Sequence, residues 1–410
     1  NRSYFYPSAS VSWVASEMFD LPEFMSFAKV RVNASQVGSD TWAYQLERSF
    51  YNLDRIGGIY EASVENTLKN PNLKPTRTNQ YEIGFDIRLF DYRLNLDMAL
   101  YTGSSFDQIT PVNVSSSTGY NFRYVNVGEV SNKGIELALN TVPVKLSNFQ
   151  WDLGFTYTRN INEVVSLADG VDALTIGTGY SGIRTEAKPG SPYGNIIGYG
   201  FKRDPQGNIV HVNGLPVKGD KEMVLGNITP DWIGSITTQF RYKNVSLSAL
   251  FNIKMGGEIF SLTTQWMRQY GLDEATDVPL RQGNIIGDGV TEQEINGETV
   301  YVSNDVSVPF SDYSYWYNAY GLHESCIFDA SYVKLGELRL GYELPDHLTE
   351  RVKCQRIMLA LVGRNLGLLY SKIPHVDPET SISADKSKMG FEIFNMPSAR
   401  TITFNLIVNI

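Results

Sequence analysis

Cysteine is scarce in this chain, which has Cys326 and Cys354 among its 410 residues. Two cysteines cannot supply the set of bridges that holds small secreted domains together. We therefore expect two separate thiols and no disulfide framework. Cys326 and Cys354 fall at opposite ends of the strand predicted for 328–345, which places them tens of ångströms apart at about 3.3 Å per residue.

Long hydrophobic runs and basic patches are also missing. No window contains 18 consecutive apolar residues, which excludes a membrane-spanning helix. A membrane β-barrel stays possible, because its strands need an apolar residue only at alternate positions. The formal net charge is −9 and the 35 Lys and Arg residues are spread along the sequence, so we expect no nucleic-acid partner.

Sequence signatures of catalysis are absent. The four histidines, His211, His323, His347 and His375, lie far apart, and none belongs to an HExxH sequence. Neither a GxSxG nor a Walker sequence occurs, and no EF-hand calcium loop is present. Paired glycosidase carboxylates cannot be assigned from spacing alone. We therefore predict no enzyme activity and no cofactor, and we assign no metal ligand; calcium binding by the Asp-rich loops stays an open alternative.

What the sequence does contain is strict alternation of apolar and polar residues, clearest in Phe328–Pro345. From Glu337 to Leu344 every second side chain is apolar, which is typical of a strand with unlike faces. The stretch would form a strand of about 17 residues, against about 5–6 in globular proteins. Val333 and Leu335 fall out of phase, which predicts a β-bulge near Gly336 or the point where the strand leaves an apolar surrounding.

The same pattern recurs along the chain, and we predict about 12 antiparallel strands; no run with a helical period is strong enough to assign a helix. The alternating stretches are 8–16, 27–37, 81–89, 92–100, 135–139, 149–157, 232–242, 245–253, 328–345, 357–361 and 402–410. Short connections follow the odd strands and long loops follow the even ones. In an antiparallel meander all short turns then lie at one end, which is typical of an outer-membrane barrel.

Several segments resemble those of SusC/RagA-type TonB-dependent outer-membrane transporters. They are FYPSASVSWVASEMF (5–19), NPNLKPTRTNQYEIGFDIRLF (70–90), VNVGEVSNKGIELAL (125–139), DASYVKLGELRLGYELP (329–345) and VGRNLGLLYSKIPHVDPET (362–380). The matches keep the family's order over essentially the whole chain. One departure is the last residue, Ile410, where outer-membrane proteins commonly end in an aromatic residue.

The resemblance implies an all-β, antiparallel transmembrane β-barrel of about 22 strands with an N-terminal plug. Residues 1–410 would be its C-terminal part, a mature fragment that begins inside its fold, since no secretory signal precedes the first strand. The implied function is active import of an oligosaccharide or peptide across the bacterial outer membrane. The implied partners are a SusD-like lipoprotein lid, TonB acting through the missing plug, the N-terminal half of the transporter, and outer-membrane lipid.

Two groups of side chains are candidate sites. The ionised faces of the strands should face the lumen, where they would hold the plug and line the path, or simply form a hydrated surface: Glu82, Asp86, Arg88, Arg93, Asp97, Glu337 and Arg339. The aromatic residues of one long loop could bind substrate, or else pack the loop or contact the lid: Trp266, Tyr270, Tyr313, Tyr315, Trp316, Tyr317 and Tyr320.

Two alternatives to active import remain open at this point. The first is a soluble all-β protein that binds or cleaves glycans, which would be monodisperse without detergent. The second is a passive porin, whose uptake would not depend on the proton-motive force.

Overall fold

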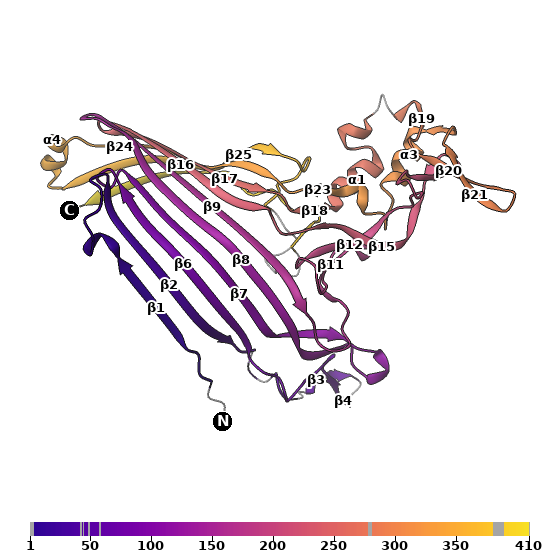
Figure 1. Ribbon diagram of the computed structural model, residues 1–410. Coiled ribbons are helices and arrows are strands. Elements are labelled where there is room, and N and C mark those ends of the chain that lie inside the picture. Colours follow the sequence, from indigo (N-terminus) through magenta and orange to yellow (C-terminus); the bar gives the residue numbers. More distant parts are fainter. Residues whose placement is uncertain are drawn as a thin grey trace. The chain divides into compact units, whose positions relative to one another are not determined.

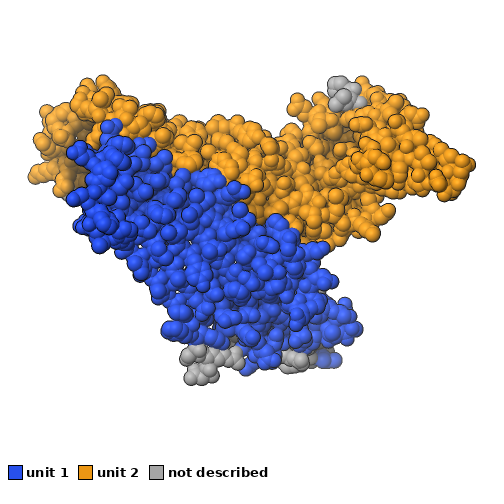
Figure 2. Space-filling view, viewed as in Figure 1, with its two compact units in different colours: residues 1–141, 156–175, 187–193 blue, residues 142–155, 176–186, 194–410 orange. Residues whose placement is uncertain are grey.

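The computed structural model describes residues 4–409 apart from 42, 44, 48–49, 57–58, 278–280 and 380–388. The chain forms two compact units, coloured separately in Figure 2. Unit 1 comprises residues 1–141, 156–175 and 187–193; unit 2 comprises residues 142–155, 176–186 and 194–410. Among the described residues, no helix is long and apolar enough to cross a membrane.

One large sheet contains eleven strands that follow each other in chain order (Figure 1). They are β1 (Ser8–Val14), β2 (Met25–Ser39), β6 (Thr76–Leu89), β7 (Leu94–Asn113), β8 (Phe122–Lys145), β9 (Phe149–Ser166), β16 (Trp232–Tyr242), β17 (Val245–Met255), β24 (Tyr332–Glu343), β25 (Arg356–Ser371) and β27 (Thr401–Asn409). The twelfth member, β5 (Thr67–Leu68), pairs in parallel with β8, off this path. The all-β antiparallel prediction is confirmed, although the ordered path ends at the eleventh strand.

The connections largely follow the predicted alternation. Short links span 15–24, 90–93, 146–148, 243–244 and 344–355, and long ones span 40–75, 167–231, 256–331 and 372–400. The exception is 114–121, which is short because β7 and β8 continue far beyond their alternating stretches. Outside an apolar surrounding, neither face of a strand needs apolar residues, so the pattern fades while the hydrogen-bonded ladder continues.

The apolar face of the sheet is exposed. In unit 2 one cross-strand row runs through Phe240, Leu247, Leu340, Leu361 and Phe404, from β16 to β27. These side chains are 39% to 65% exposed. A water-soluble protein would bury such a row, whereas a barrel wall presents it to lipid.

Unit 1 repeats this arrangement. Val11, Val32, Ile83 and Leu100 are aligned across β1, β2, β6 and β7, and each is exposed. The opposite face carries the charged side chains described below. The alternation read from the sequence therefore separates two real faces in both units.

The stretch 328–345 is not one continuous strand. β23 (Ile327–Asp329) pairs with β18 (Glu258–Ser261) in a separate small sheet, and β24 begins only at Tyr332. The bulge predicted at Gly336 is confirmed, because Leu250 pairs with Glu337 and Phe251 with Leu335, which leaves Gly336 without a partner. The extra residue shifts the phase, so Val333 and Leu335 join the apolar face beside residues of β17.

The long connections are folded, which the sequence did not predict. In unit 2 they contain α1 (Leu262–Tyr270) and α3 (Phe310–Tyr317), and the short link 344–355 contains α4 (Asp346–Thr349). The further strands of unit 2 are β12 (Asn195–Phe201), β13 (Val210–Val212), β14 (Leu215–Pro216), β15 (Lys218–Asn227), β19 (Asn284–Ile286), β20 (Val290–Ile295), β21 (Glu298–Ser303), β22 (Ser307–Pro309) and β26 (Phe391–Glu392). β10 (Leu174–Thr178) and β11 (Arg184–Ala187) each contain residues of both units, and unit 1 adds β3 (Phe50–Ile56) and β4 (Ile59–Val64). The sequence did not indicate these helices, because α1 and α3 are too short for a 3.6-residue period to stand out.

The loop segments of unit 2 share a hydrophobic core. Its fully buried members are Ile183, Ile196, Phe260, Leu262, Cys326 and Phe391. Cys326 precedes β23 and Cys354 precedes β25, so the 12-residue β24 separates them, and both thiols are free. The predicted separation of the two cysteines is confirmed.

Candidate functional site

The polar face of unit 1 carries a network of charges. Asp86 of β6 and Asp97 of β7 are direct cross-strand neighbours, and two like charges in this position repel each other. Arg31 of β2 compensates by donating to both carboxylate oxygens of Asp97, at 2.8 and 3.1 Å. Lys29 and Arg88 lie 3.5 and 3.2 Å from Asp86. The charges are thus mutually paired.

This network borders an open cavity of about 400 Å³ in unit 1. Asp86, Arg88 and Asp97 line it together with Tyr92 and Asn95. Glu82, also a predicted lumen residue, lies 3.5 Å from Arg31. Four of the predicted residues therefore belong to one cluster on one face.

The remaining predicted ionised residues lie elsewhere. Arg93 lies in the turn 90–93 and not on a strand, because β7 begins one residue later, at Leu94. Glu337 of β24 accepts a hydrogen bond from Arg364 at 2.8 Å. Arg339 donates to the sulfur of Met358 at 2.9 Å. Both belong to the polar face of unit 2.

The seven aromatic residues predicted to bind substrate fall into three groups. Trp266, Tyr270 and Tyr320 are exposed and join a continuous cluster with Tyr180 and Phe394, in which neighbouring ring centroids lie 5.0 to 6.4 Å apart. We call these five side chains the aromatic patch. An exposed set of connected rings offers flat apolar faces and polar edges, which suits a sugar face or a peptide side chain.

The other four predicted rings do not reach the aromatic patch. Tyr313 and Tyr317 stack on each other and are half-buried, and Tyr317 also contacts Phe201 at 4.6 Å between centroids. Burial raises the pKa of Tyr313 to about 12. Tyr315 and Trp316 form a separate exposed pair on α3. The packing interpretation therefore fits Tyr313 and Tyr317.

A rigid support holds α1, which carries Trp266 and Tyr270. Ser261 caps its N-terminus by accepting from the backbone N–H of Thr264 at 3.0 Å, and Gly271 ends it with a φ of 72°. Ser314 of α3 donates to the backbone oxygen of Arg268 at 3.0 Å. The two helices are therefore fixed to each other.

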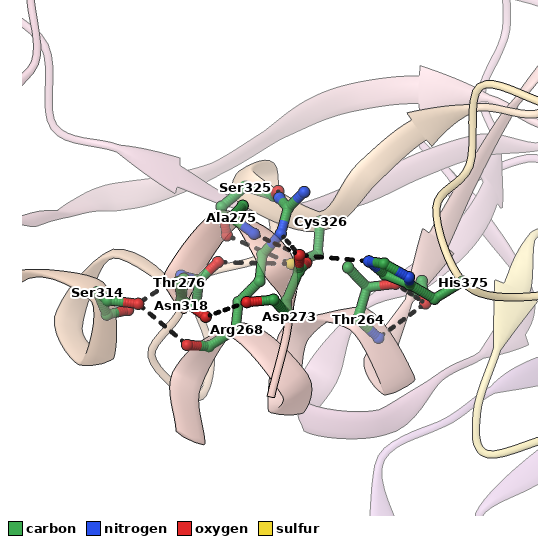
Figure 3. Close-up of polar contacts among 11 residues, drawn as sticks. Thr264, Arg268, Asp273, Ala275, Thr276, Ser314, Asn318, Ser325, Cys326 and His375 are labelled. Atoms are coloured by element: carbon green, nitrogen blue, oxygen red, sulfur yellow. Dashed lines mark hydrogen bonds and ion pairs between the residues drawn. The ribbon is translucent and has the colours of Figure 1, made fainter. Parts of the chain in front are cut away.

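Figure 3 shows how Asp273 gathers several segments. Its carboxylate accepts from Arg268 Nε at 2.7 Å and from the backbone N–H of Ala275 at 2.9 Å, and it lies 3.2 Å from His375 Nε2. Burial acts to raise the pKa of Asp273, but these donors outweigh it and lower the pKa overall. Arg268 also donates to the backbone oxygen of Ser325 at 3.2 Å, and this hydrogen bond links α1 to the segment that precedes β23.

Tyr180 is positioned by a buried histidine. Its neighbour Ser181 lies 2.8 Å from His323 Nε2, and the backbone N–H of Tyr199 donates to His323 Nδ1 at 3.0 Å. Because Nδ1 accepts, Nε2 carries the proton and donates to Ser181. Burial lowers the pKa of His323 to about 4, so the imidazole is neutral.

Four contributors were missed by the sequence reasoning. Lys29 and Arg31 occupy the polar positions of the second alternating strand, a signal that was present. Tyr180 and Phe394 come from loops 86 and 128 residues distant in sequence from Trp266, and nothing local indicates that they meet. Within the described part of the chain, no group of His, Cys, Asp and Glu side chains could hold a metal ion. The charged cluster of unit 1 and the aromatic patch of unit 2 are therefore surfaces suited to binding.

Comparison with known proteins agrees with this architecture. Residues 1–366 match the family described as TonB dependent receptor-like, beta-barrel. TonB-dependent receptor P3 of Formosa agariphila is 25% identical over 99% of this chain and 42% of its own length. TonB-dependent receptor SusC of Bacteroides thetaiotaomicron is 26% identical over 42% of this chain and 18% of its own length.

Solved structures share the fold. The RagAB peptide importer in the closed-closed state superposes with a TM-score of 0.75 at 17% identity, over all of this chain and 44% of the matched chain. Its open-open state gives a TM-score of 0.72 at 18% identity, over all of this chain and 43% of the matched chain. The chain spans 42% of the length of the first relative named above. Because the family model matches residues 1–366, the chain belongs to the TonB-dependent receptor β-barrel family of outer-membrane proteins.

Proposed function

We propose that the chain forms part of the wall and loops of an outer-membrane transporter that actively imports a large nutrient, an oligosaccharide or a peptide. The observation that carries this proposal is the aromatic patch, held on buttressed loops of a unit whose sheet exposes an apolar face. An apolar exterior suits lipid, and exposed rings suit capture of a nutrient. Transport in this proposal involves no chemical conversion of the nutrient.

The whole of residues 1–410 would act as one portion of the barrel. Among the described residues, β1 and β27 end the ordered sheet and each has one edge without a strand partner. Open edges are costly in lipid, because backbone groups there have no water to bind. We infer that both edges pair with other strands of the same transporter, for a total of about 22.

Family membership supports a proposal for the energy source and the lid. TonB would act through a plug outside this chain, and a SusD-like lipoprotein would close the mouth. The polar cluster around Asp86, Asp97 and Arg31 would face the plug and the path of the nutrient. The solved RagAB structure is described as that of a peptide importer, which supports a peptide as the nutrient. The proposal keeps an oligosaccharide as the other nutrient class.

Uptake by cells that carry the full transporter tests the aromatic patch. The substrates would be labelled maltooligosaccharides and a labelled tryptic peptide digest. Substituting Trp266→Ala and Tyr320→Ala together should raise the half-saturation concentration about tenfold, since each ring contact contributes about 0.5–1.5 kcal/mol. The matched control is Phe90→Ala, an exposed ring of the 90–93 turn that belongs to neither candidate site, which should leave uptake unchanged.

Two further outcomes separate the alternatives. Collapse of the proton-motive force by a protonophore should abolish uptake; uptake that persists would indicate a passive porin. Extraction should require detergent, and a monodisperse transporter in plain buffer would indicate the soluble glycan-binding alternative. Unchanged uptake in the double variant, with the barrel intact, would refute the role of the aromatic patch.

A further inference from the structure

The polar face of unit 2 contains a small pocket at the short-turn end of four strands. Its volume is about 200 Å³. Arg241 of β16, Lys243 of the β16–β17 turn, Arg339 of β24 and Arg356 of β25 all line it. We call this the cationic pocket. It includes Arg339 from the predicted ionised face, but none of the residues that line the unit 1 cavity or form the aromatic patch.

Small residues lie beside the arginines of the pocket. Arg241, Ser246 and Gly341 are cross-strand neighbours in one row of the polar face, and Ser246 lines the pocket with Arg241. A Cβ atom at Gly341 would lie 2.6 Å from Ser246 Oγ and 3.7 Å from Arg339 Nη1, so a side chain at this position would crowd Ser246.

The charge of the cationic pocket is not balanced. Its lining contains one carboxylate, Glu343, which Arg356 binds through two nitrogens at 2.6 and 3.0 Å. Within the part of the chain that the structure describes, Arg241, Lys243 and Arg339 have no carboxylate at ion-pair distance. Arg339 instead donates to the sulfur of Met358, a weak acceptor.

We propose that the cationic pocket binds a multiply charged carboxylate. Two guanidinium groups offer planar pairs of donors that match carboxylate oxygens, and Lys243 adds a compact charge. The carboxylates come either from a free di- or tricarboxylate or from acidic side chains of the transporter outside this chain. The proposal does not depend on which nutrient is imported.

Calorimetric titration of the purified full transporter with citrate tests the free source. Citrate should bind, and Arg241→Gln and Arg339→Gln should each weaken binding about tenfold, with further weakening at high salt. The control is Arg351→Gln, which removes the same charge from an exposed residue of the 344–355 link that does not line the pocket. Heat-modifiable electrophoretic mobility confirms that each variant is folded.

Carbodiimide cross-linking with peptide mass spectrometry tests the second source, because it joins a lysine amine to a carboxylate at contact distance. If the transporter fills its own pocket, Lys243 should be cross-linked to an acidic residue outside residues 1–410. The yield should fall in Arg339→Gln and persist in Arg351→Gln. Either citrate binding lost in the pocket variants or this cross-link supports the proposal; the absence of both overturns it.

Discussion

His323 and Tyr199 bind each other through two hydrogen bonds across 124 residues of sequence. The backbone N–H of Tyr199 donates to His323 Nδ1 at 3.0 Å, and the backbone N–H of His323 donates to the Tyr199 oxygen at 2.9 Å. A protonated ring could not accept at Nδ1. The contact therefore requires a neutral imidazole, and it holds the loop that contains His323 and Tyr320 against β12.

Acidification should loosen this loop. The folded pKa of His323, about 4, lies below the ordinary 6.5, so the opened loop takes up a proton first as the pH falls. The stabilisation is complete above about pH 6.5 and decreases toward pH 4, by about 1 kcal/mol at pH 5.5. Hydrogen-exchange protection of the 195–201 and 320–327 peptides in the full transporter, corrected for intrinsic rates, should fall accordingly.

The variant His323→Gln should remove most of this pH dependence, because glutamine keeps a donor and an acceptor but does not titrate. His347→Gln is the matched control, since His347 is exposed in α4. Protection that stays constant from pH 7 to 5 in the unmodified transporter would contradict the neutral, buried imidazole.

Lys334 should matter far more than Lys372, although both bind acidic residues of unit 2. Lys334 is 4% exposed and its ammonium lies 2.6 Å from Glu379 and 3.2 Å from Asp377. Lys334→Met leaves these carboxylates without their cation and should destabilise the 372–379 segment by about 3 kcal/mol. The side chains of Lys372 and its partner Asp329 are 51% and 36% exposed, so Lys372→Met should cost under about 1 kcal/mol.

Limited proteolysis of the folded transporter measures this difference. The 372–379 segment should become cleavable in Lys334→Met at protease concentrations that leave both the unmodified protein and Lys372→Met intact. Equal resistance of the two variants would show that the buried ion pair does not hold this segment.

Gly128 of β8 should not tolerate any side chain. Its φ is 32°, and a Cβ atom there would lie 1.6 Å from the backbone oxygen of Ser166. Because the obstacle is backbone, Gly128→Ala should cost about 3 kcal/mol or more and impair assembly. Gly367 of β25 has open space at the same position, so Gly367→Ala should assemble normally. Heat-modifiable mobility of newly made protein distinguishes the two outcomes.

Much of the sheet could be predicted from the sequence because a barrel wall repeats one simple rule. Alternate residues must suit lipid and water, so Leu338, Leu340 and Tyr342 identify the face of β24 directly. The bulge at Gly336 was also readable, since a single extra residue reverses the phase. The ends of the strands could not be predicted, because β7 continues to Asn113, beyond the part in which lipid imposes the apolar–polar alternation.

The sites were harder to predict, because they depend on contacts between distant loops. Alternation indicated the ionised face around Asp86 and Asp97, but not that Arg31 of another strand neutralises it. Composition indicated the aromatic loop, yet it could not separate Trp266, which is exposed, from Tyr317, which packs on Phe201. Only the tertiary structure shows that Tyr180 joins the patch.

The central claim is that β24 forms membrane wall, with lipid on one face and water on the other. Nitroxide labels placed singly at residues 333, 335 and 337–342 test it in the reconstituted full transporter. The background is Cys354→Ser, because Cys326 is buried and burial raises the pKa of its thiol to about 11, which keeps it unreactive.

The relative accessibility of each label to oxygen and to a water-soluble nickel complex is the measurement. Labels at 338, 340 and 342 should be accessible to oxygen, labels at 337, 339 and 341 to nickel, and labels at 333 and 335 should match the oxygen group because of the bulge at Gly336. Equal nickel accessibility at all positions would contradict the account.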